Sequence, residues 1–335
     1  MYQLLRPLLF SLDPETAHRI TLQLLRITGN FPISNWLLTQ LYKTPTKPVQ
    51  AFGLTFKNPV GLAAGYDKDA LAIRGLAALG FGHIEVGTVT LEAQAGNPRP
   101  RVFRLVEDEA VINRMGFPSK GAKFVSKQLS ATSGQKSVIL GVNLGKNKDT
   151  PLEEAAKDYI ELMKVFAPLA DYLTINISSP NTVGLRRLQG REMLEHLLAQ
   201  INVERGTRNV KLPILVKISP DMSEDELEDA VGVILEKGMD GIIAANTTLA
   251  REGARSRYQR ESGGLSGSPL RVRSEAVLNR VVKLVEGRIP IISAGGIMSP
   301  EDAKKRLAMG ASLVQVYTGL VYRGPALVRE MVRAL

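Results

Sequence analysis

The feature that most constrains the fold is a regular alternation of short apolar runs with helix-like stretches, which starts after Gly53 and continues to the end of the chain. There are eight apolar runs, at residues 60–65, 83–88, 138–144, 173–177, 214–218, 241–246, 289–294 and 313–317. Helical patterns lie between them, at 70–79, 151–166, 191–205, 223–237, 271–286 and 300–308. Strands that alternate with helices pair in parallel through right-handed crossovers.

Eight such units over about 280 residues match a (β/α)8 TIM barrel in number and size. The alternative is an open, doubly wound α/β sheet. No strand is followed by the GxGxxG or Walker A loop that such sheets use for nucleotides, so the barrel is favoured. Two inserts interrupt the alternation: residues 89–137, with an extra hairpin or loop around 101–105, and the polar, Gly-rich loop 249–270.

Residues 1–45 form a small helical extension ahead of the barrel of residues 46–335. Leucines recur at helical spacing over residues 4–12, and Asp13-Pro14-Glu15 then reads as the N-cap, first position and acidic first turn of a second helix. This second helix is expected to stop at Gly29-Asn30. Two interpretations stay open: an amphipathic hairpin packed on the barrel, or an element that meets a membrane surface or a lipophilic ligand.

Composition excludes several function classes. The chain has no Cys, and its three histidines lie far apart, so no metal site or thiol chemistry is expected. The net charge of +10 suits nucleic acid, an anionic membrane or small anions, but aromatics are 5% and no dense Lys/Arg block occurs, which argues against nucleic acid. No apolar run reaches ~18 residues, and no secretory signal is present. We expect the reducing cytoplasm or its membrane face.

The residues at the strand ends predict a binding site. In a barrel all strand ends project to one rim, where they bring together Asn143, Asn176, Asn246, Gly295-Gly296 and Tyr317-Thr318-Gly319. Asn is depleted in strands, so three at matched positions suggest a planar ligand with many donors and acceptors. The glycines fall where barrels commonly bind phosphate, and Lys68 and Lys217 add positive charge. This rim fits a mononucleotide such as FMN and a small anion.

Four segments carry a specific family resemblance: 58–65 (NPVGLAAG), 113–117 (NRMGF), 176–181 (NISSPN) and 263–267 (GGLSG). Through them the chain resembles the membrane-associated, quinone-dependent class of dihydroorotate dehydrogenases over nearly its full length. The soluble classes carry Cys as catalytic base, so Ser179 and the N-terminal extension indicate the quinone class. On the residues alone, Ser-Ser-Pro-Asn reads equally well as a turn that ends a strand.

The resemblance implies oxidation of (S)-dihydroorotate to orotate in de novo pyrimidine (UMP) biosynthesis, with Ser179 as general base and hydride transfer to flavin N5. It implies FMN contacts from Ala64, Gly65, Tyr66, Asp67, Lys68, Thr88, Asn143, Asn176, Lys217, Ala245, Gly267, Gly296, Tyr317 and Thr318. It implies substrate contacts from Lys68, Asn113, Arg114, Met115, Gly116, Phe117, Asn176, Asn181, Asn246 and Thr247. His18, Arg104 and Tyr317 would meet the quinone, and Thr182 and Phe117 would relay the Ser179 proton. Ala245 and Tyr66 depart from the common family residues.

The implied partners are dihydroorotate and orotate, a membrane quinone and an anionic membrane surface, for a monomer held peripherally on the cytoplasmic face of the cell membrane. Glu85 and Asp67 read as strand and turn structure rather than as catalytic groups. The loop 182–190, with Gly184 and Gly190 as hinges, would close over the substrate. Two rivals remain: a non-redox barrel, such as an isomerase or aldolase that uses a rim Lys or Glu, and a binding-only protein.

Overall fold

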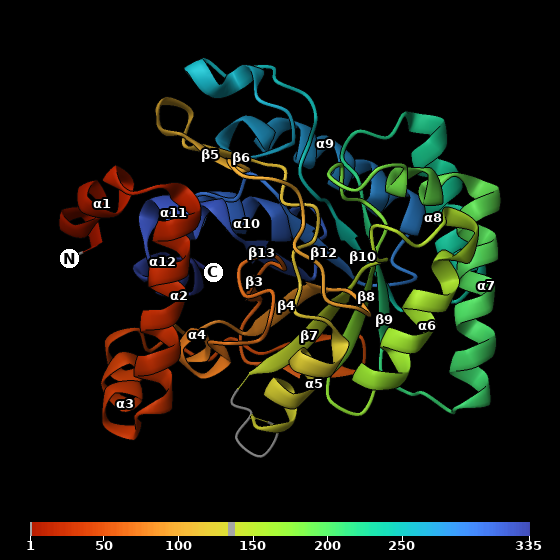
Figure 1. Cartoon of the computed structure of the whole chain (residues 1–335), viewed down its shortest axis with the longest axis horizontal. Helices are drawn as coiled ribbons and strands as arrows, with labels where there is room; N and C mark the ends of the chain where they lie inside the picture. The colour runs from red at the N-terminus through yellow and green to blue at the C-terminus, as the bar shows by residue number, and fades with distance from the viewer. Residues whose placement is uncertain (1, 133–137) are drawn as a thin grey trace.

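A computed structural model describes residues 2–132 and 138–335 and confirms the predicted (β/α)8 barrel (Figure 1). Eight parallel strands close on themselves in the order of the chain, with β13 pairing with β3. The strands are β3 (Val60–Leu62), β4 (His83–Val89), β7 (Ile139–Leu144), β8 (Tyr172–Asn176), β9 (Ile214–Ile218), β10 (Gly241–Ala244), β12 (Ile291–Ala294) and β13 (Leu313–Val316).

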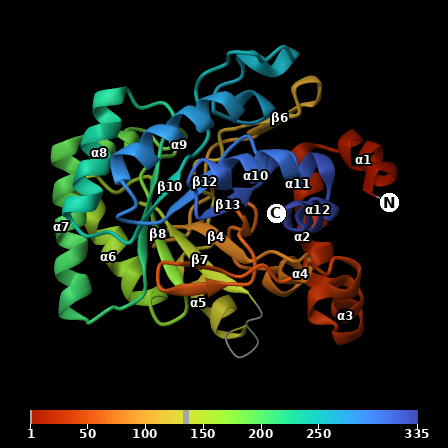
Figure 2. The ribbon, with the colours of Figure 1, turned by 180° about the vertical axis from the view of Figure 1, so that it is seen from behind.

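Helices surround this barrel on its outer face, as Figures 1 and 2 show from opposite sides. They are α4 (Ile73–Ala78), α5 (Ala122–Ser130), α6 (Ala155–Phe166), α7 (Arg191–Thr207), α8 (Glu224–Glu236), α9 (Arg271–Val285), α10 (Pro300–Ala308), α11 (Thr318–Arg323) and α12 (Ala326–Ala334). Local sequence explains their starts: Ser223 and Glu226 form a reciprocal capping box at α8, and Ser299 caps α10 ahead of Pro300.

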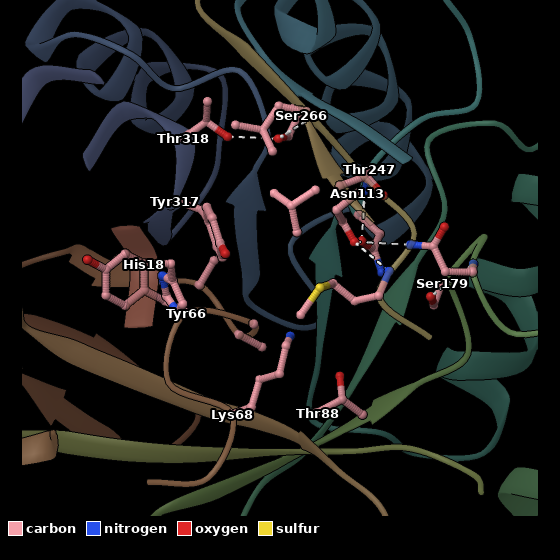
Figure 3. A pocket seen from close by; sticks show the side chains of 18 of the residues that line it. His18, Tyr66, Lys68, Thr88, Asn113, Ser179, Thr247, Ser266, Tyr317 and Thr318 are labelled. Atoms are coloured by element: carbon pink, nitrogen blue, oxygen red, sulfur yellow. Dashed lines mark hydrogen bonds between the residues drawn. The ribbon is translucent and has the colours of Figure 1, made fainter. Parts of the chain in front are cut away.

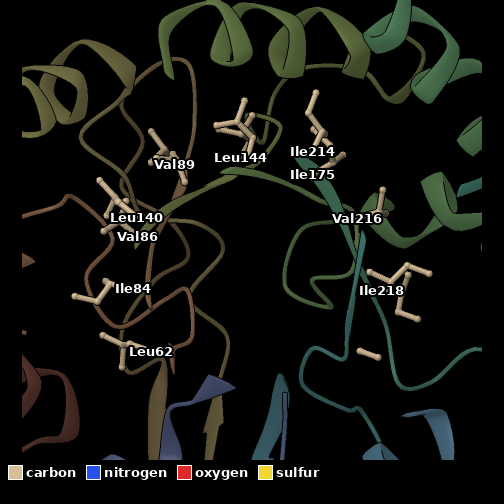
Figure 4. Packing of buried hydrophobic residues seen from close by; sticks show 14 of the residues in the cluster. Leu62, Ile84, Val86, Val89, Leu140, Leu144, Ile175, Ile214, Val216 and Ile218 are labelled. Atoms are coloured by element: carbon tan, nitrogen blue, oxygen red, sulfur yellow. The ribbon is translucent and has the colours of Figure 1, made fainter. Parts of the chain in front are cut away.

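The main core lies between the strands and the helices. Figure 4 shows Ile84, Val86, Leu140, Ile175 and Val216 among its buried side chains. These strands are buried on both faces, which is why they read as continuous apolar runs rather than as alternating ones.

The amino-terminal end of the barrel is closed by a hairpin of β1 (Val49–Ala51) and β2 (Leu54–Phe56). Phe56 and Ala51 are buried there among Tyr172, Leu215 and Ile243. The opposite, carboxyl end of the strands is therefore the end that is left for a ligand.

A three-stranded antiparallel sheet is built from the two inserts. The predicted hairpin of residues 89–137 is present as β5 (Val102–Leu105) and β6 (Ala110–Asn113). The insert 249–270, which reads as a loop because of its glycines, contributes a third strand, β11 (Gly264–Gly267), to the far edge of β6. That pairing joins residues about 150 positions apart, so no local pattern signals it.

The N-terminal segment contains three helices where the hydrophobic pattern predicts two: α1 (Tyr2–Ser11), α2 (Pro14–Asn30) and α3 (Pro32–Leu41). The start of α2 is as predicted, with the Asp13 side chain accepting a hydrogen bond from Thr16 N at 2.9 Å. The third helix is apolar on several sides, so its pattern shows no single face. Helix α2 packs closely on α4, since a Cβ on Gly29 would lie 2.3 Å from Gly75 N.

The outer surface of these helices is strongly apolar. Leu4, Ile33 and Trp36 are 83%, 77% and 60% exposed, and α1 and α3 have no fully buried residue. Within the described residues, none of the helices has the length and apolar character that a membrane crossing needs.

Candidate active site

A cavity of about 560 Å³ opens at the carboxyl ends of the strands, bounded by the barrel rim, the β5–β6–β11 sheet and helix α2. Figure 3 shows His18, Tyr66 and Tyr317 grouped on one side of it and Asn113, Ser179 and Thr247 on the other. Most of the sequence-predicted site residues line this one cavity: His18, Ala64, Gly65, Tyr66, Lys68, Thr88, Asn113, Met115, Gly116, Phe117, Asn176, Ser179, Asn181, Lys217, Ala245, Asn246, Thr247, Gly267, Gly296, Tyr317 and Thr318.

Four predicted site residues lie outside that lining, each held elsewhere. The buried Asp67 carboxylate accepts hydrogen bonds from the backbone N–H groups of Leu71 and Ala72 at 2.8 and 2.7 Å, and burial raises its pKa to about 6. It therefore holds the turn that leads to α4. Asn143 is fully buried in the layer beneath the rim.

The other two are arginines turned towards neighbouring loops. Arg114 forms an ion pair with Glu261 at 2.6 Å and stacks over the Phe103 ring at 4.6 Å. Arg104 donates to the main-chain carbonyls of Leu9 and Leu12. It thus joins the end of α1 to the β5 strand, beside the cavity rather than in its wall.

One end of the cavity has a cradle suited to a phosphate group. Gly295 and Gly296 both have positive φ, +98° and +69°, and a Cβ on Gly296 would lie 2.4 Å from Arg271 Cα. Gly267 is equally restricted, since its Cβ would lie 2.3 Å from Glu109 O. Among the described residues, no carbonyl accepts the N–H of Gly296. A free N–H at such a close-packed turn is a donor available to an anion.

A buried arginine supports this cradle from below. Arg306 has no exposed side-chain surface and donates to the carbonyls of Gly295 at 3.2 Å and Arg271 at 3.0 Å. It also donates to Ser274 Oγ at 2.8 Å. The backbone of the glycine pair is thereby fixed from the side opposite to the cavity.

Two lysines, the half-buried Lys68 and the buried Lys217, supply the positive charge. Burial lowers the pKa of Lys68 to about 8, partly opposed by Asp69. Burial also lowers the pKa of Lys217, against the attraction of Glu85, whose Oε1 lies 3.9 Å from Lys217 Nζ. At that distance the ammonium makes no hydrogen bond to the carboxylate, so its protons stay available to a ligand in the cavity.

The predicted rim asparagines are linked by hydrogen bonds. Asn176 Nδ2 donates to Asn143 Oδ1 at 2.9 Å and to Thr88 Oγ1 at 3.0 Å. Asn176 Oδ1 accepts from Ser178 Oγ at 2.9 Å, and this hydroxyl in turn accepts from Asn246 Nδ2 at 2.9 Å. The three asparagines are therefore one ordered network rather than three independent contacts.

Ser179 is 5% exposed and lines the cavity beside this network. Its Oγ accepts a hydrogen bond from Asn181 N at 3.2 Å, and within the described residues no carboxylate or imidazole accepts its proton. Nearby in sequence, the hydroxyl of Thr182 is buried with no partner among the described residues. An activating base for Ser179 is thus absent from the described residues, and the Thr182 hydroxyl is free to take part in proton transfer.

The aromatic side of the cavity is apolar and neutral. The ring centroids of His18 and Tyr66 are 4.8 Å apart, and those of Tyr66 and Tyr317 are 5.6 Å apart. Burial, followed by the charge of Lys68, lowers the pKa of His18 to about 4, so the imidazole is neutral at pH 7. Leu22 of α2 completes this wall.

Sequence reasoning missed several arginines that hold the loops over the site. Arg186 donates to the carbonyls of Ser178 and Thr247 at 3.0 and 2.9 Å and pairs with Asp221 at 2.8 Å, which ties the 182–190 loop to the segments that follow β8, β10 and β9. These arginines act through tertiary contacts to main-chain carbonyls. The sequence around them shows no pattern that predicts those contacts.

A second arginine clamp joins α2 to the loop in front of the cavity. Arg101 pairs with Glu15 at 2.7 Å and donates to the carbonyls of Ala95 and Asn97. Asn97 in turn donates to the carbonyl of Asn181 at 3.1 Å. The N-terminal helices and the Ser179–Asn181 segment are therefore connected through one chain of polar contacts.

Fold and site together define a ligand-binding (β/α)8 barrel with a phosphate cradle, a cationic floor and an apolar entrance. The family model described as "Dihydroorotate dehydrogenase" matches residues 47–335. "Dihydroorotate dehydrogenase (quinone)" of Roseiflexus sp. (strain RS-1) is 49% identical over 337 residues, covering 100% of this chain and 93% of the relative. The protein of the same description from Idiomarina loihiensis is 47% identical over 339 residues, covering 100% of both chains.

Solved structures agree with this. The ligand-free DHODH of Eimeria tenella superposes with a TM-score of 0.86 at 40% identity, covering 96% of this chain and 94% of that one. Its complex with ferulenol superposes with a TM-score of 0.85 at 40% identity, covering 96% of this chain and 90% of that one. The chain belongs to the dihydroorotate dehydrogenase family.

Proposed function

We propose that this protein oxidises (S)-dihydroorotate to orotate in pyrimidine biosynthesis, with FMN as prosthetic group and a membrane quinone as electron acceptor. The family supports the reaction, and the quinone acceptor is in the printed description of relatives up to 49% identical. The observation that carries the proposal is that one cavity holds a phosphate cradle, the Lys217 ammonium and the Ser179 hydroxyl, and is walled by α2.

The residues present fit a mononucleotide. Gly267, Gly296 and Thr318 line the phosphate end with a close approach of the backbone, while Lys217 offers side-chain donors for a planar ring beside Thr88 and Asn176. When bound, the flavin would supply the hydride acceptor, which no side chain can provide. The ammonium of Lys217 would stabilise the negative charge that develops on reduction.

The polar side of the cavity would bind the substrate. Asn113, Asn181, Asn246 and Thr247 present amide and hydroxyl groups for its ring and carboxylate, and Lys68 adds a cation. Asn181 Nδ2 donates to Asn113 Oδ1 at 3.2 Å, so the two loops that carry them are already joined. Ser179 would take the C5 proton and pass it on through the unpartnered Thr182 hydroxyl.

The aromatic side would admit the quinone. His18 and Tyr317 line it, and Arg104 holds the α1–α2 junction that frames its entrance. The exposed leucines and Trp36 of α1 to α3, with the net positive charge, would place a monomer peripherally on an anionic membrane at the cytoplasmic face.

The deciding experiment is the visible absorption spectrum of the purified protein. We expect a flavin spectrum with one FMN per chain, bleached anaerobically by dihydroorotate and restored by quinone much faster than by NAD or fumarate. A colourless protein would point to the non-redox barrel, and fast fumarate turnover with little quinone activity would refute the class.

A further inference from the structure

Glu85 of β4 is a buried carboxylate inside the barrel, one layer beneath the cavity floor, and the function proposed above does not use it. It has no exposed surface. Its Oε1 accepts from Asn143 Nδ2 at 2.8 Å. Its Oε2 accepts from Tyr172 Oη at 3.1 Å, Thr174 Oγ1 at 3.2 Å and Gln315 Nε2 at 3.0 Å.

Every neighbour of this carboxylate is therefore a donor, and the nearest charge is the ammonium of Lys217. A carboxylate is the only side-chain group that accepts at both ends. Four donors and one cation face its two oxygens, so both ends of the side chain act as acceptors. The core of the barrel thus holds a negative group that is surrounded by donors and one positive charge.

This charge determines how the rim amides are oriented. Because Asn143 must present its NH₂ to Glu85, its Oδ1 must face upwards, where it accepts from Thr88 and Asn176. Asn176 then presents its own NH₂ downwards and its Oδ1 to Ser178. In this way Glu85 determines which amide end donates and which accepts in the whole network, as far as Asn246.

The same charge offsets Lys217. The ammonium is buried, and Glu85 is its only ion-pair partner among the described residues. The floor beneath the cavity consequently combines one positive and one negative charge. In the dry interior such charges act on a bound ligand with little screening.

We propose that Glu85 is a positioning residue that orders the rim asparagines and, by compensating Lys217, lowers the reduction potential of the bound flavin. The inference rests on the proposed function, because it requires a flavin above Lys217. Reduction of the flavin would add negative charge above the cavity floor. Lys217 would attract this charge, and Glu85 would repel it.

The test is the Glu85→Gln variant, which keeps the shape of the side chain and removes the charge. The NH₂ group of the introduced Gln can be accommodated. Gln315 Oε1 is buried without a partner among the described residues, and a flip of the Gln315 amide would let this oxygen accept a hydrogen bond from that NH₂ group. We expect the midpoint potential of the bound flavin, measured for the variant and the wild type at the same pH, to become more positive. A tenfold shift of the redox equilibrium corresponds to about 30 mV for two electrons.

The matched control is Tyr172→Phe, which removes one hydrogen bond to Glu85 and leaves the charge in place. Its midpoint potential should stay at the wild-type value. An unchanged or more negative potential in Glu85→Gln would overturn the inference, and so would an equal positive shift in Tyr172→Phe. If wild-type protein binds no flavin, the proposed function itself fails, which is a separate result.

A second pair of variants serves if Glu85→Gln does not fold. Lys217→Met leaves the negative charge uncompensated, whereas Glu85→Gln combined with Lys217→Met removes both charges. A buried ion pair can often be replaced by neutral groups without loss of stability. The double variant should have the more positive midpoint potential, and equal potentials in the two proteins would overturn the inference.

Discussion

Replacing Arg306 by Met tests the support beneath the phosphate cradle. The guanidinium is fully buried and donates to Ser293 Oγ, Ser274 Oγ and the carbonyls of Arg271 and Gly295 at 2.8–3.3 Å. Burial lowers its pKa to about 10, which shows that desolvation opposes the charged form. Met keeps the length of the apolar stem and removes all four hydrogen bonds.

The expected loss follows from these contacts. Hydrogen bonds from a charged donor contribute ~1.5–3 kcal/mol each, and relief of the buried charge offsets a large part of their sum. We expect a net loss of about 3 kcal/mol in the free energy of unfolding. For a chain of this size that lowers the unfolding temperature by roughly 4 °C. Differential scanning calorimetry of the apoprotein measures this without any contribution from a ligand.

The control is the neighbouring Lys305→Met. Lys305 is 58% exposed and pairs with Glu275 at 2.7 Å, the same carboxylate that lies 3.7 Å from Arg306. An exposed pair contributes ~0–1 kcal/mol, so its loss should hardly change the unfolding temperature. If both variants unfold at the same temperature, the buried contacts of Arg306 do not stabilise this corner as argued.

Three further predictions can be tested separately. Ser179→Ala should retain FMN and slow flavin reduction by at least ~100-fold in stopped-flow measurements, with a smaller effect from Ser178→Ala; a near wild-type rate would require another base. Deleting residues 1–45 should preserve FMN and reduction by dihydroorotate but abolish quinone turnover and binding to anionic liposomes. Full turnover of a long-tailed quinone would refute this, and loss of FMN would show that the helices belong to the core. Burial lowers the pKa of His18 to about 4 and of His83 to about 3 from 6.5, so the folded state binds fewer protons than the unfolded one and the free energy of unfolding falls as the pH drops below 6.5. His83→Phe should flatten this decline in urea unfolding at a series of pH values, and an unaltered slope would show that His83 does not contribute.

The sequence determined the barrel because parallel strands buried on both faces leave a local signature. Each of the eight predicted runs overlaps a strand of the barrel, and β9 spans 214–218 as predicted. Where the runs were too long, as at β3 and β10, the extra residues are the Ala, Gly and Asn residues that leave the ladder at the rim. The location of most candidate site residues follows from the same rule, since parallel strands end at one face.

Only the tertiary structure decided the depth and the partners of those residues. Asn143 and Asn176 both lie near the ends of predicted runs, yet Asn143 is in register with Thr174 and so lies deeper in the barrel than Asn176, where it donates to Glu85 outside the cavity lining. Strand β11 and the clamps of Arg101, Arg186 and Arg306 depend on contacts between distant parts of the chain. Hydrophobic periodicity reports which face of an element is buried, but it carries no information on which distant carbonyl or carboxylate that face will meet.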